Sequence, residues 1–183
     1  MTEVYRLGIK ILAEDSADIR SKEFVPIFHS WIQNKSIEGH QLIDVHDYSH
    51  IHNGPGILLV AHEGNFSTDM AEGKLGLAYS RKMPLGASTE DALRGCVKAA
   101  RDAMTLLENE PALKGRLRFR RGEFLLFFND RLLAPNDAPT FEKLKPLLTK
   151  GFGNASLTHV SAGTKDRLTV KVKSPEGIGR DIQ

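Results

Sequence analysis

Histidine is concentrated near the middle of the chain. Four of the seven histidines fall within 17 residues, at His46, His50, His52 and His62. Imidazole nitrogens bind divalent transition metals, usually together with carboxylate oxygens, and Asp44 and Asp47 lie beside the first of these histidines. We therefore predict a site for a divalent transition metal formed by His46, His50 and His52, although their spacing matches no established zinc motif. In the alternative interpretation, these three histidines are exposed loop residues that hold no ligand.

His62 and Glu63 suggest a second kind of chemistry. The pair follows an apolar run that reads as a strand, and Gly64 and Asn65 come next. Imidazole and carboxylate groups act as general acids and bases, and a glycine lets a ligand approach the backbone closely. We predict His62 and Glu63 as catalytic candidates, with His50 and Asn65 as ligand-binding residues. In the alternative interpretation, His62 is a core histidine bonded to a backbone carbonyl and Glu63 is a surface residue.

Arginine and lysine alternate with apolar residues in three segments. The basic residues concerned are Arg6, Lys10, Arg116, Arg118, Arg120, Arg167, Lys171 and Lys173. Successive side chains of a strand point to opposite faces, so each apolar set places its basic set on the other face. If the three strands are neighbours, the sheet presents a basic surface. Since a guanidinium binds carboxylate or phosphate bidentately, Arg116, Arg118 and Arg120 are predicted ligands of an anion.

This basic surface also has a simpler explanation. Lysine and arginine on exposed strands prevent edge-to-edge pairing between copies of a protein, so the face could be merely solvated. Nucleic acid is considered as a partner but is not favoured, because readers of single strands stack bases on exposed aromatic rings. The phenylalanines nearest these arginines belong to the predicted core instead. Pairing of two copies through the open face is left open.

The net charge of +2 conceals an asymmetry along the chain. Residues 111–183 carry 14 Lys and Arg against 7 Asp and Glu, whereas the first 110 residues carry 11 against 16. Such an asymmetry indicates either an anionic partner or a basic half that folds against an acidic half. A further candidate segment, 129–136, follows a predicted strand and contains polar groups at Asn129, Asp130 and Arg131. In the alternative interpretation, Asp130 and Arg131 pair locally or cap the following turn.

Several classes of protein are excluded by composition. Cys96 is the only cysteine, which excludes an internal disulfide, and it lies on an apolar helical stripe rather than in a reactive setting. No apolar run approaches the ~20 residues of a membrane helix, and the first residues lack the layout of a secretion signal. We therefore expect a soluble, cytoplasmic protein that does not contact a membrane.

Hydrophobic periodicity predicts eight strands and three helical segments. The strands are expected at 4–12, 41–47, 57–62, 74–81, 116–121, 123–129, 155–162 and 167–173. The helices are expected at 24–33, at 88–108 with Ser88 as the N-terminal cap, and from about 137. Pro146 within the third helix predicts a kink or a division into two short pieces. Between 116 and 129 we predict a hairpin that turns at Gly122. The order is β-α-β-β-β-α-β-β-α-β-β.

Short connections between consecutive strands favour antiparallel pairing. The predicted class is α+β, a single domain over residues 1–173 in which two or three helices pack on one face of a largely antiparallel sheet. Residues 174–183 are expected to form a flexible C-terminal tail.

The function suggested by these residues is that of a ligand-binding or interaction domain. Its polar site would be formed by histidine, glutamate and aspartate on loops 44–56 and 62–69, and its ligand would be small and polar or anionic. One alternative is a small enzyme that uses a metal or a His/Glu acid–base pair. The other is a binder of polyanions or nucleic acid through the basic sheet face. No sequence motif decides whether the protein catalyses a reaction.

Overall fold

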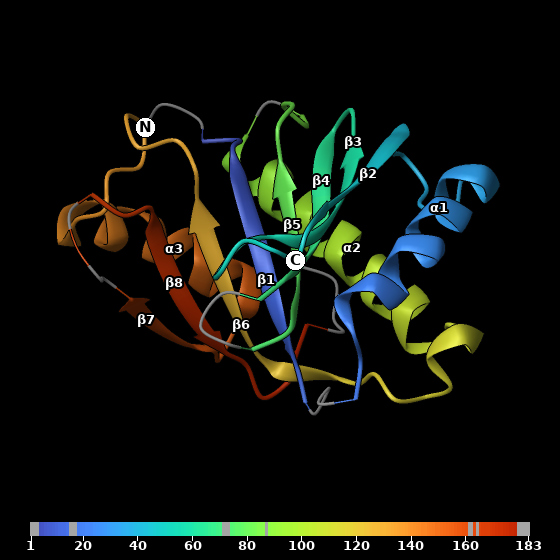
Figure 1. Cartoon of the computed structure of the whole chain (residues 1–183). Helices are drawn as coiled ribbons and strands as arrows, with labels where there is room; N and C mark the ends of the chain where they lie inside the picture. Colours follow the sequence, from blue (N-terminus) through green and yellow to red (C-terminus); the bar gives the residue numbers. More distant parts are fainter. Residues whose placement is uncertain are drawn as a thin grey trace.

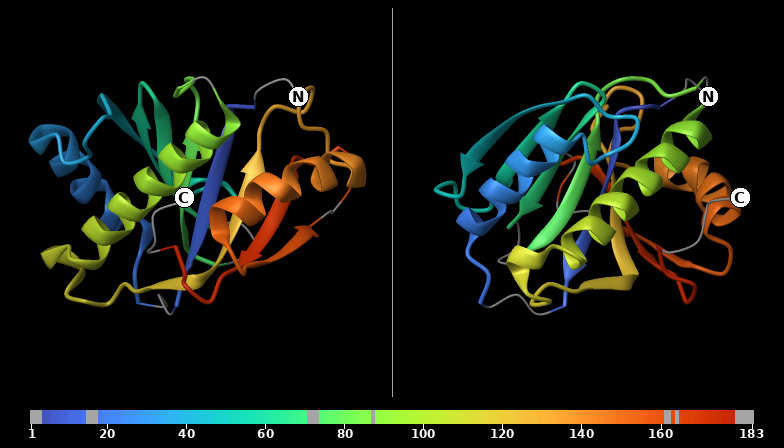
Figure 2. Two further views of the ribbon diagram at one scale, coloured as in Figure 1. Left: turned by 180° about the vertical axis from the view of Figure 1, so that it is seen from behind. Right: turned by 90° about the vertical axis from the view of Figure 1, so that its right-hand side faces the viewer.

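Eight antiparallel strands form one sheet, and the helices lie against one of its two faces (Figure 1). The computed structural model describes residues 4–14, 18–70, 74–86, 88–160, 163 and 165–178. Figure 2 shows the helices in front of the sheet when the molecule is viewed from behind. The α+β class predicted from the sequence, with helices on one face of an antiparallel sheet, is confirmed.

The spatial order of the strands is β2-β3-β4-β5-β1-β6-β8-β7. Their bounds are β1 Leu7–Ala13, β2 Leu42–Tyr48, β3 Gly56–Ala61, β4 Gly64–Asp69, β5 Gly76–Arg81, β6 Phe119–Phe128, β7 Ser156–Val160 and β8 Leu168–Lys173. The helices are α1 Phe24–Asn34, α2 Thr89–Glu108 and α3 Ala138–Phe152, with short 3-10 helices η1 Ser21–Glu23 and η3 Pro111–Leu113. The predicted strand residues 161–162 lie outside the described residues.

The core lies between the sheet and the three helices. On the central strand β1, Leu7, Ile9 and Ile11 are fully buried against it, as their alternation with polar residues predicts. Helix α2 begins as expected, because the Ser88 hydroxyl accepts a hydrogen bond from the backbone N–H of Asp91. Such a cap satisfies one of the helix's unpaired N–H groups.

The predicted hairpin at Gly122 is wrong. Residues 119–128 form one continuous strand, β6, which pairs with β1 on one side and with β8 on the other. Gly122 is not in the left-handed conformation that a tight turn requires, and its carbonyl accepts a hydrogen bond from Ser174 N–H. The glycine suggested a turn, but β1 and β8 lie on either side of β6 and form backbone hydrogen bonds with it. These hydrogen bonds favour an extended backbone at this position.

A strand was missed where the sequence suggested a turn or a short helix. Residues 64–69 form β4, which pairs with β3 and β5. The element order is therefore β-α-β-β-β-β-α-β-α-β-β. Polar residues dominate β4, so its composition does not indicate a strand; only Phe66 faces the core as a large side chain. The pairing of its backbone with both neighbours decides its conformation.

Helix α3 is one helix that continues through Pro146, whose side chain is exposed, so the predicted alternative of two short pieces is wrong. Phe141, Leu144 and Leu148 are buried on its inner face. The beginning of the predicted flexible tail is packed: Ile178 is 1% exposed and its backbone N–H donates to the carbonyl of Arg121. Residues 179–183 lie outside the described residues.

Candidate anion site on the open face of the sheet

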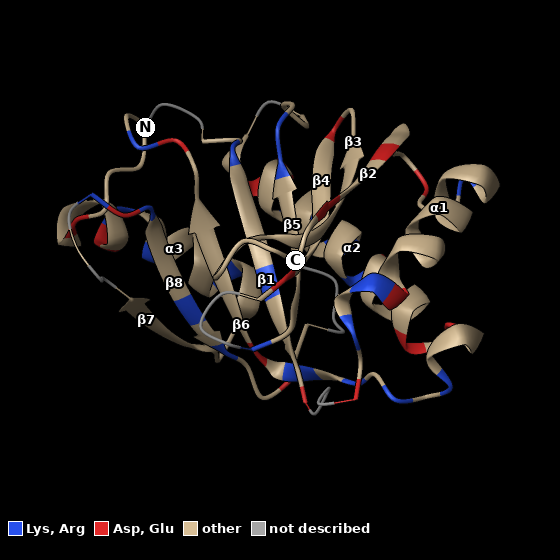
Figure 3. Ribbon diagram, in the orientation of Figure 1, with Lys and Arg blue, Asp and Glu red and all other residues tan. Residues whose placement is uncertain are grey.

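The face of the sheet opposite the helices carries a polar cavity over its central strands. The cavity has a volume of about 650 Å³ and is lined by Lys10, Asp69, Leu125, Asn129, Arg131, Val160, Asp166, Arg167, Thr169 and Lys171. Four of these residues lie on β1, β6 and β8. These three strands are neighbours, which is the condition on which the predicted basic surface depended. Figure 3 shows lysine and arginine on β1, on β8 and near the start of β6.

Arg167 is the central basic group of this cavity. Its guanidinium carbon lies 3.7 Å from the centre of the Phe127 ring, a stacked arrangement in which the positive charge meets the negative face of the aromatic system. Nη1 donates a long hydrogen bond, 3.4 Å, to the Asn129 side-chain oxygen. Among the described residues, no carboxylate forms an ion pair with Arg167. Partial burial lowers the pKa of the guanidinium, although the negative charge of Asp69 raises it.

Lys10 supplies a second cation at the floor of the cavity. Its side chain is buried, and Nζ lies 2.8 Å from a carboxylate oxygen of Asp69 two strands away. The Lys10 side chain passes over Gly76 of β5, the strand between β1 and β4. A Cβ atom on Gly76 would lie 2.8 Å from the Lys10 Cε. A glycine at this position therefore allows the lysine to cross β5 and reach its partner.

Lys171 is held at the other side by an acidic neighbour. Its Nζ lies 2.8 Å from Glu123 Oε1, and Lys173 approaches the other oxygen at 3.5 Å. The hydrogen bond from Lys171 lowers the pKa of the Glu123 carboxyl. The acidic residue thus interleaves with the basic ones, as expected where like charges would otherwise be adjacent on a sheet.

The cavity lining is basic in balance. It contains the cations Lys10, Arg131, Arg167 and Lys171 against the carboxylates Asp69 and Asp166, four positive groups against two negative ones. The positive charge of Arg131 contributes to lowering the pKa of the Arg167 guanidinium. The neighbouring Asp130 has a local role, because its carboxylate accepts hydrogen bonds from the backbone N–H groups of Leu132 and Leu133.

The predicted anion ligands Arg116, Arg118 and Arg120 lie outside this cavity. Arg116 and Arg118 precede β6, and Arg120 is its second residue. Arg116 forms an ion pair with Glu23 of η1. Arg118 donates to the backbone carbonyl of Glu108 at 3.1 Å, and Arg120 is exposed. Leu117 and Phe119 are buried, as their alternation with the arginines predicted. Because β6 begins only at Phe119, Arg116 and Arg118 are not part of the sheet, and the three arginines do not form a row on its open face.

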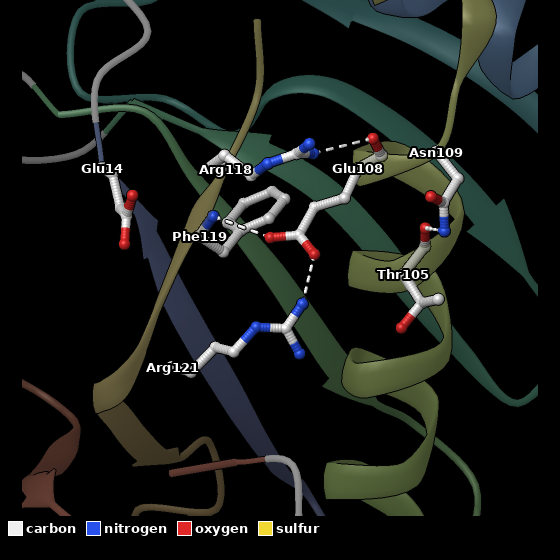
Figure 4. A pocket seen from close by; sticks show the side chains of 7 residues that line it. All are labelled: Glu14, Thr105, Glu108, Asn109, Arg118, Phe119 and Arg121. Carbon is white, nitrogen blue, oxygen red and sulfur yellow. Dashed lines mark hydrogen bonds and ion pairs between the residues drawn. The ribbon is translucent and has the colours of Figure 1, made fainter. Parts of the chain in front are cut away.

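Glu108 at the end of α2 pairs with one arginine at the start of β6, Arg121. Figure 4 shows its carboxylate between the backbone N–H of Phe119 and the guanidinium of Arg121. The Phe119 N–H donates at 3.0 Å, and the Glu108 side chain is 8% exposed. The arrangement joins the helix to the first residues of β6, which is a structural role.

The histidines predicted to bind a metal are not brought together. His46 lies on the edge strand β2, and His50 and His52 lie in the loop that follows; all three are exposed. Within the described ranges, no group of three His, Cys, Asp or Glu side chains is placed to hold a metal ion. His62 lies at the other end of the antiparallel β2–β3 pair, so the four histidines do not converge.

His62 and Glu63 form the two-residue connection between β3 and β4. His62 is exposed, and its backbone N–H donates to the carbonyl of Gln41. Glu63 accepts a hydrogen bond from the Gln41 N–H at 2.8 Å, and this bond together with the nearby His40 lowers the pKa of its carboxyl against the opposing effect of burial. Both residues therefore fasten the start of β2 to this turn.

Asn65 is placed on the open face of β4, and its side-chain oxygen is buried without a hydrogen-bond partner among the described residues. The sequence selected Asn65 as a ligand-binding candidate, and it lies apart from the cavity lining. His50, the other ligand-binding candidate, lies in the exposed loop after β2.

The sequence did not single out His40, Tyr79 and Arg81, which form a polar cluster on the helix-covered side. His40 Nε2 lies 2.8 Å from the Tyr79 hydroxyl, and Arg81 Nη1 lies 3.4 Å from the same oxygen. A signal for Arg81 was present: in the segment 74–81, Leu75, Leu77 and Tyr79 share one face, and Arg81 continues that alternation into the core.

Searches against protein-family models and against curated proteins find no match for this chain. None of the helices in the described part of the chain is long and apolar enough to span a membrane.

Proposed function

We propose that the protein is a binding domain for a small anion, such as a phosphate or carboxylate group, which it holds in the cavity on the open face of the sheet. The observation that carries this proposal is Arg167. Its guanidinium is partly buried, is held against the Phe127 ring at 3.7 Å and has no carboxylate partner within the described chain. Withdrawing a cation from water without a counter-charge is unfavourable, and a bound anion would supply that charge.

The remaining lining supports the same ligand class. The guanidinium fork fits two oxygens of a carboxylate or phosphate group, and Arg131 adds positive charge at the exposed rim. A volume of about 650 Å³ falls within the ordinary range of small-molecule sites. Thr169 on β8 also lines the cavity, and its hydroxyl donates to the backbone carbonyl of Arg167.

A small anion is favoured over a nucleic acid strand. A protein that binds single strands stacks successive bases on exposed rings, whereas Phe127 is 3% exposed and is covered by Arg167. Two of the arginines that would extend the surface toward the start of β6 are balanced by carboxylates, Arg116 by Glu23 and Arg121 by Glu108. This pairing reduces the positive charge available to a strand that leaves the cavity in that direction.

The test is titration calorimetry of the purified full chain with inorganic phosphate, pyrophosphate and citrate at low salt. We expect binding of at least one of them, weakened at least tenfold in Arg167→Gln. Arg118→Gln is the matched control, because it also removes one arginine but lies outside the cavity. Equal affinity in both variants, or no binding of any of the three anions, would contradict the proposal. Tight, salt-dependent binding of a single-stranded RNA that survives Arg167→Gln would favour the nucleic acid alternative.

A further inference from the structure

A second basic group, on the opposite face of the sheet, has a more unusual environment. Arg81 is the last residue of β5 and is 5% exposed. Its Nη1 and Nη2 atoms donate to the Tyr79 hydroxyl and to the carbonyl of Pro84, each across 3.4 Å. Its Nε is buried and has no hydrogen-bond partner, and in the described part of the chain no carboxylate forms an ion pair with it.

The groups that accept hydrogen bonds from Arg81 are neutral. The Glu63 carboxylate acts electrostatically on His40 and Tyr79, but it forms no ion pair with Arg81 among the described residues. The ring of His40 lies 3.2 Å from the carbonyl of Glu38 through Nδ1 and 2.8 Å from the Tyr79 hydroxyl through Nε2. A carbonyl only accepts, so Nδ1 carries the proton and Nε2 accepts from Tyr79. Burial lowers the pKa of His40 and raises those of Tyr79 and the nearby Cys96, which keeps all three groups uncharged.

The hydrogen bonds therefore run in one direction, from Arg81 to Tyr79 to His40 and on to the carbonyl of Glu38. The chain orients the Arg81 guanidinium without supplying a negative charge. A buried arginine with two long hydrogen bonds and a free Nε–H is costly, and such a cost is explained when a ligand completes the site.

An apolar groove adjoins this arginine. It lies between α2 and the loop after β5, has a volume of about 610 Å³, and its lining includes Leu85, Gly95 and Val97, with Arg94 and Lys98 among the polar residues. A Cβ atom on Gly95 would lie 2.2 Å from Leu85 Cδ2 and 3.8 Å from Arg81 Nη1. Arg81 thus lies next to the groove wall at Gly95, and the Leu85 side chain occupies the notch that this glycine leaves.

We propose that Arg81 anchors the carboxylate of a small organic acid whose apolar body lies in this groove, and that Leu85 covers the site when no ligand is bound. The fork of the guanidinium matches the two oxygens of one carboxylate, and one monoanion balances the one uncompensated charge. An apolar body would take the place of Leu85 against Gly95 and Val97. Leu85 is 42% exposed in the loop 82–86, so it can leave the notch without opening the core.

This site is distinct from the proposed anion cavity, since Arg81 and Arg167 lie on opposite faces of the sheet. The probe is 3-phenylpropionate, compared with its neutral amide and with 2-phenylethyl phosphate, in titrations of the full chain followed by the backbone NMR signals of Leu85 and Gly95. We expect the acid to bind, the amide to bind at least tenfold more weakly, and Arg167→Gln to leave the acid's affinity unchanged.

Two exposed residues of the covering loop provide a matched pair of variants that do not touch the core. Leu85→Ala removes the cover and should strengthen binding of the acid about threefold or more, whereas Met83→Ala, also 42% exposed in wild type, should leave it unchanged. Arg81→Met should abolish binding while the protein remains folded, because it removes a buried charge that has no counter-ion. If Arg81→Met does not fold, the proposal is still tested by comparing the acid with its amide and Leu85→Ala with Met83→Ala.

The proposal is overturned if the acid and the amide bind equally well, if no probe binds, or if Leu85→Ala and Met83→Ala behave alike. Retention of the acid's affinity in a folded Arg81→Met variant would also overturn it. Tighter binding of the phosphate ester than of the acid would contradict the choice of a carboxylate.

Discussion

Gly8 on β1 leaves the space that the Phe127 ring on β6 occupies. A Cβ atom at Gly8 would lie 2.3 Å from two atoms of that ring and 2.5 Å from the backbone oxygen of Tyr79. The two residues face each other in the register of β1 and β6. Because the same ring carries the guanidinium of Arg167, the glycine indirectly positions the central cation of the anion cavity.

The first prediction follows from this contact. Gly8→Ala should lower the free energy of unfolding by about 3 kcal/mol, because one of the overlapping atoms belongs to the backbone and cannot move aside easily. It should also weaken anion binding by displacing Phe127. Urea unfolding and calorimetry measure the two effects. The control is Gly122→Ala on β6, where a Cβ atom would meet only the Ser174 oxygen at 3.4 Å; an equal loss in both variants would contradict the explanation.

Glu123 should limit the affinity of the cavity for anions. Its carboxylate pairs with Lys171, which lines the cavity, so Glu123→Gln should release a cation toward the ligand and strengthen phosphate binding several-fold. Stability should change by less than about 1 kcal/mol, as expected for a partly exposed pair. Glu142→Gln, whose carboxylate is 62% exposed on α3, serves as the control. Unchanged or weaker phosphate binding in Glu123→Gln would argue against a ligand beside Lys171.

Two glycines in the left-handed conformation provide a matched pair. Gly39 has φ of 73° with open space around a would-be Cβ, whereas at Gly56, with φ of 63°, a Cβ would lie 2.2 Å from the Thr68 carbonyl oxygen. Gly39→Ala should cost about 1 kcal/mol through backbone strain alone. Gly56→Ala should cost at least about 3 kcal/mol, because overlap with the backbone of β4 is added. Chemical unfolding measures both, and similar losses would contradict the close approach of these strands.

Glu108 should contribute to stability through both of its partners. Glu108→Ala leaves the Phe119 N–H and the Arg121 guanidinium without their acceptor and should cost about 2 to 3 kcal/mol. Glu108→Gln keeps an oxygen for the Phe119 N–H and should cost about 1 kcal/mol. The difference between the two variants, measured by urea unfolding, tests the arrangement in Figure 4. An equal loss in the two variants would show that the charge alone matters.

His40 predicts a pH dependence of stability. Burial lowers its pKa below the ordinary value of 6.5, so the unfolded chain takes up a proton at a higher pH than the folded protein does. Stability contributed by neutral His40 is therefore fully present above about pH 7.5 and is lost as the pH falls through about 6.5 toward the folded pKa. The slope of the unfolding free energy between about pH 7.5 and 5.5 should be smaller in His40→Gln. An identical slope in the variant would mean that His40 is not held neutral.

The sequence correctly predicted the elements whose secondary structure follows from the spacing of residues within one segment. The apolar stripe and Ser88 cap of α2, and the alternation that buries Ile9 and Ile11, depend on spacing within one segment. The same alternation correctly placed Lys10 and Lys171 on the face away from the helices. Local spacing did not reveal β4, because its polar residues are held extended by hydrogen bonds to strands on both sides.

The sequence by itself determined the α+β class, the helix stripes and the side of the sheet on which Lys10 and Lys171 lie, because side-chain periodicity follows from backbone geometry. Tertiary structure alone decided which charges are balanced. It placed Glu123 against Lys171 and Glu108 against Arg121, and it left Arg81 and Arg167 without carboxylate partners among the described residues. Ion pairing depends on contacts within a few ångströms between segments distant in sequence, and such contacts exist only once the strand order is formed.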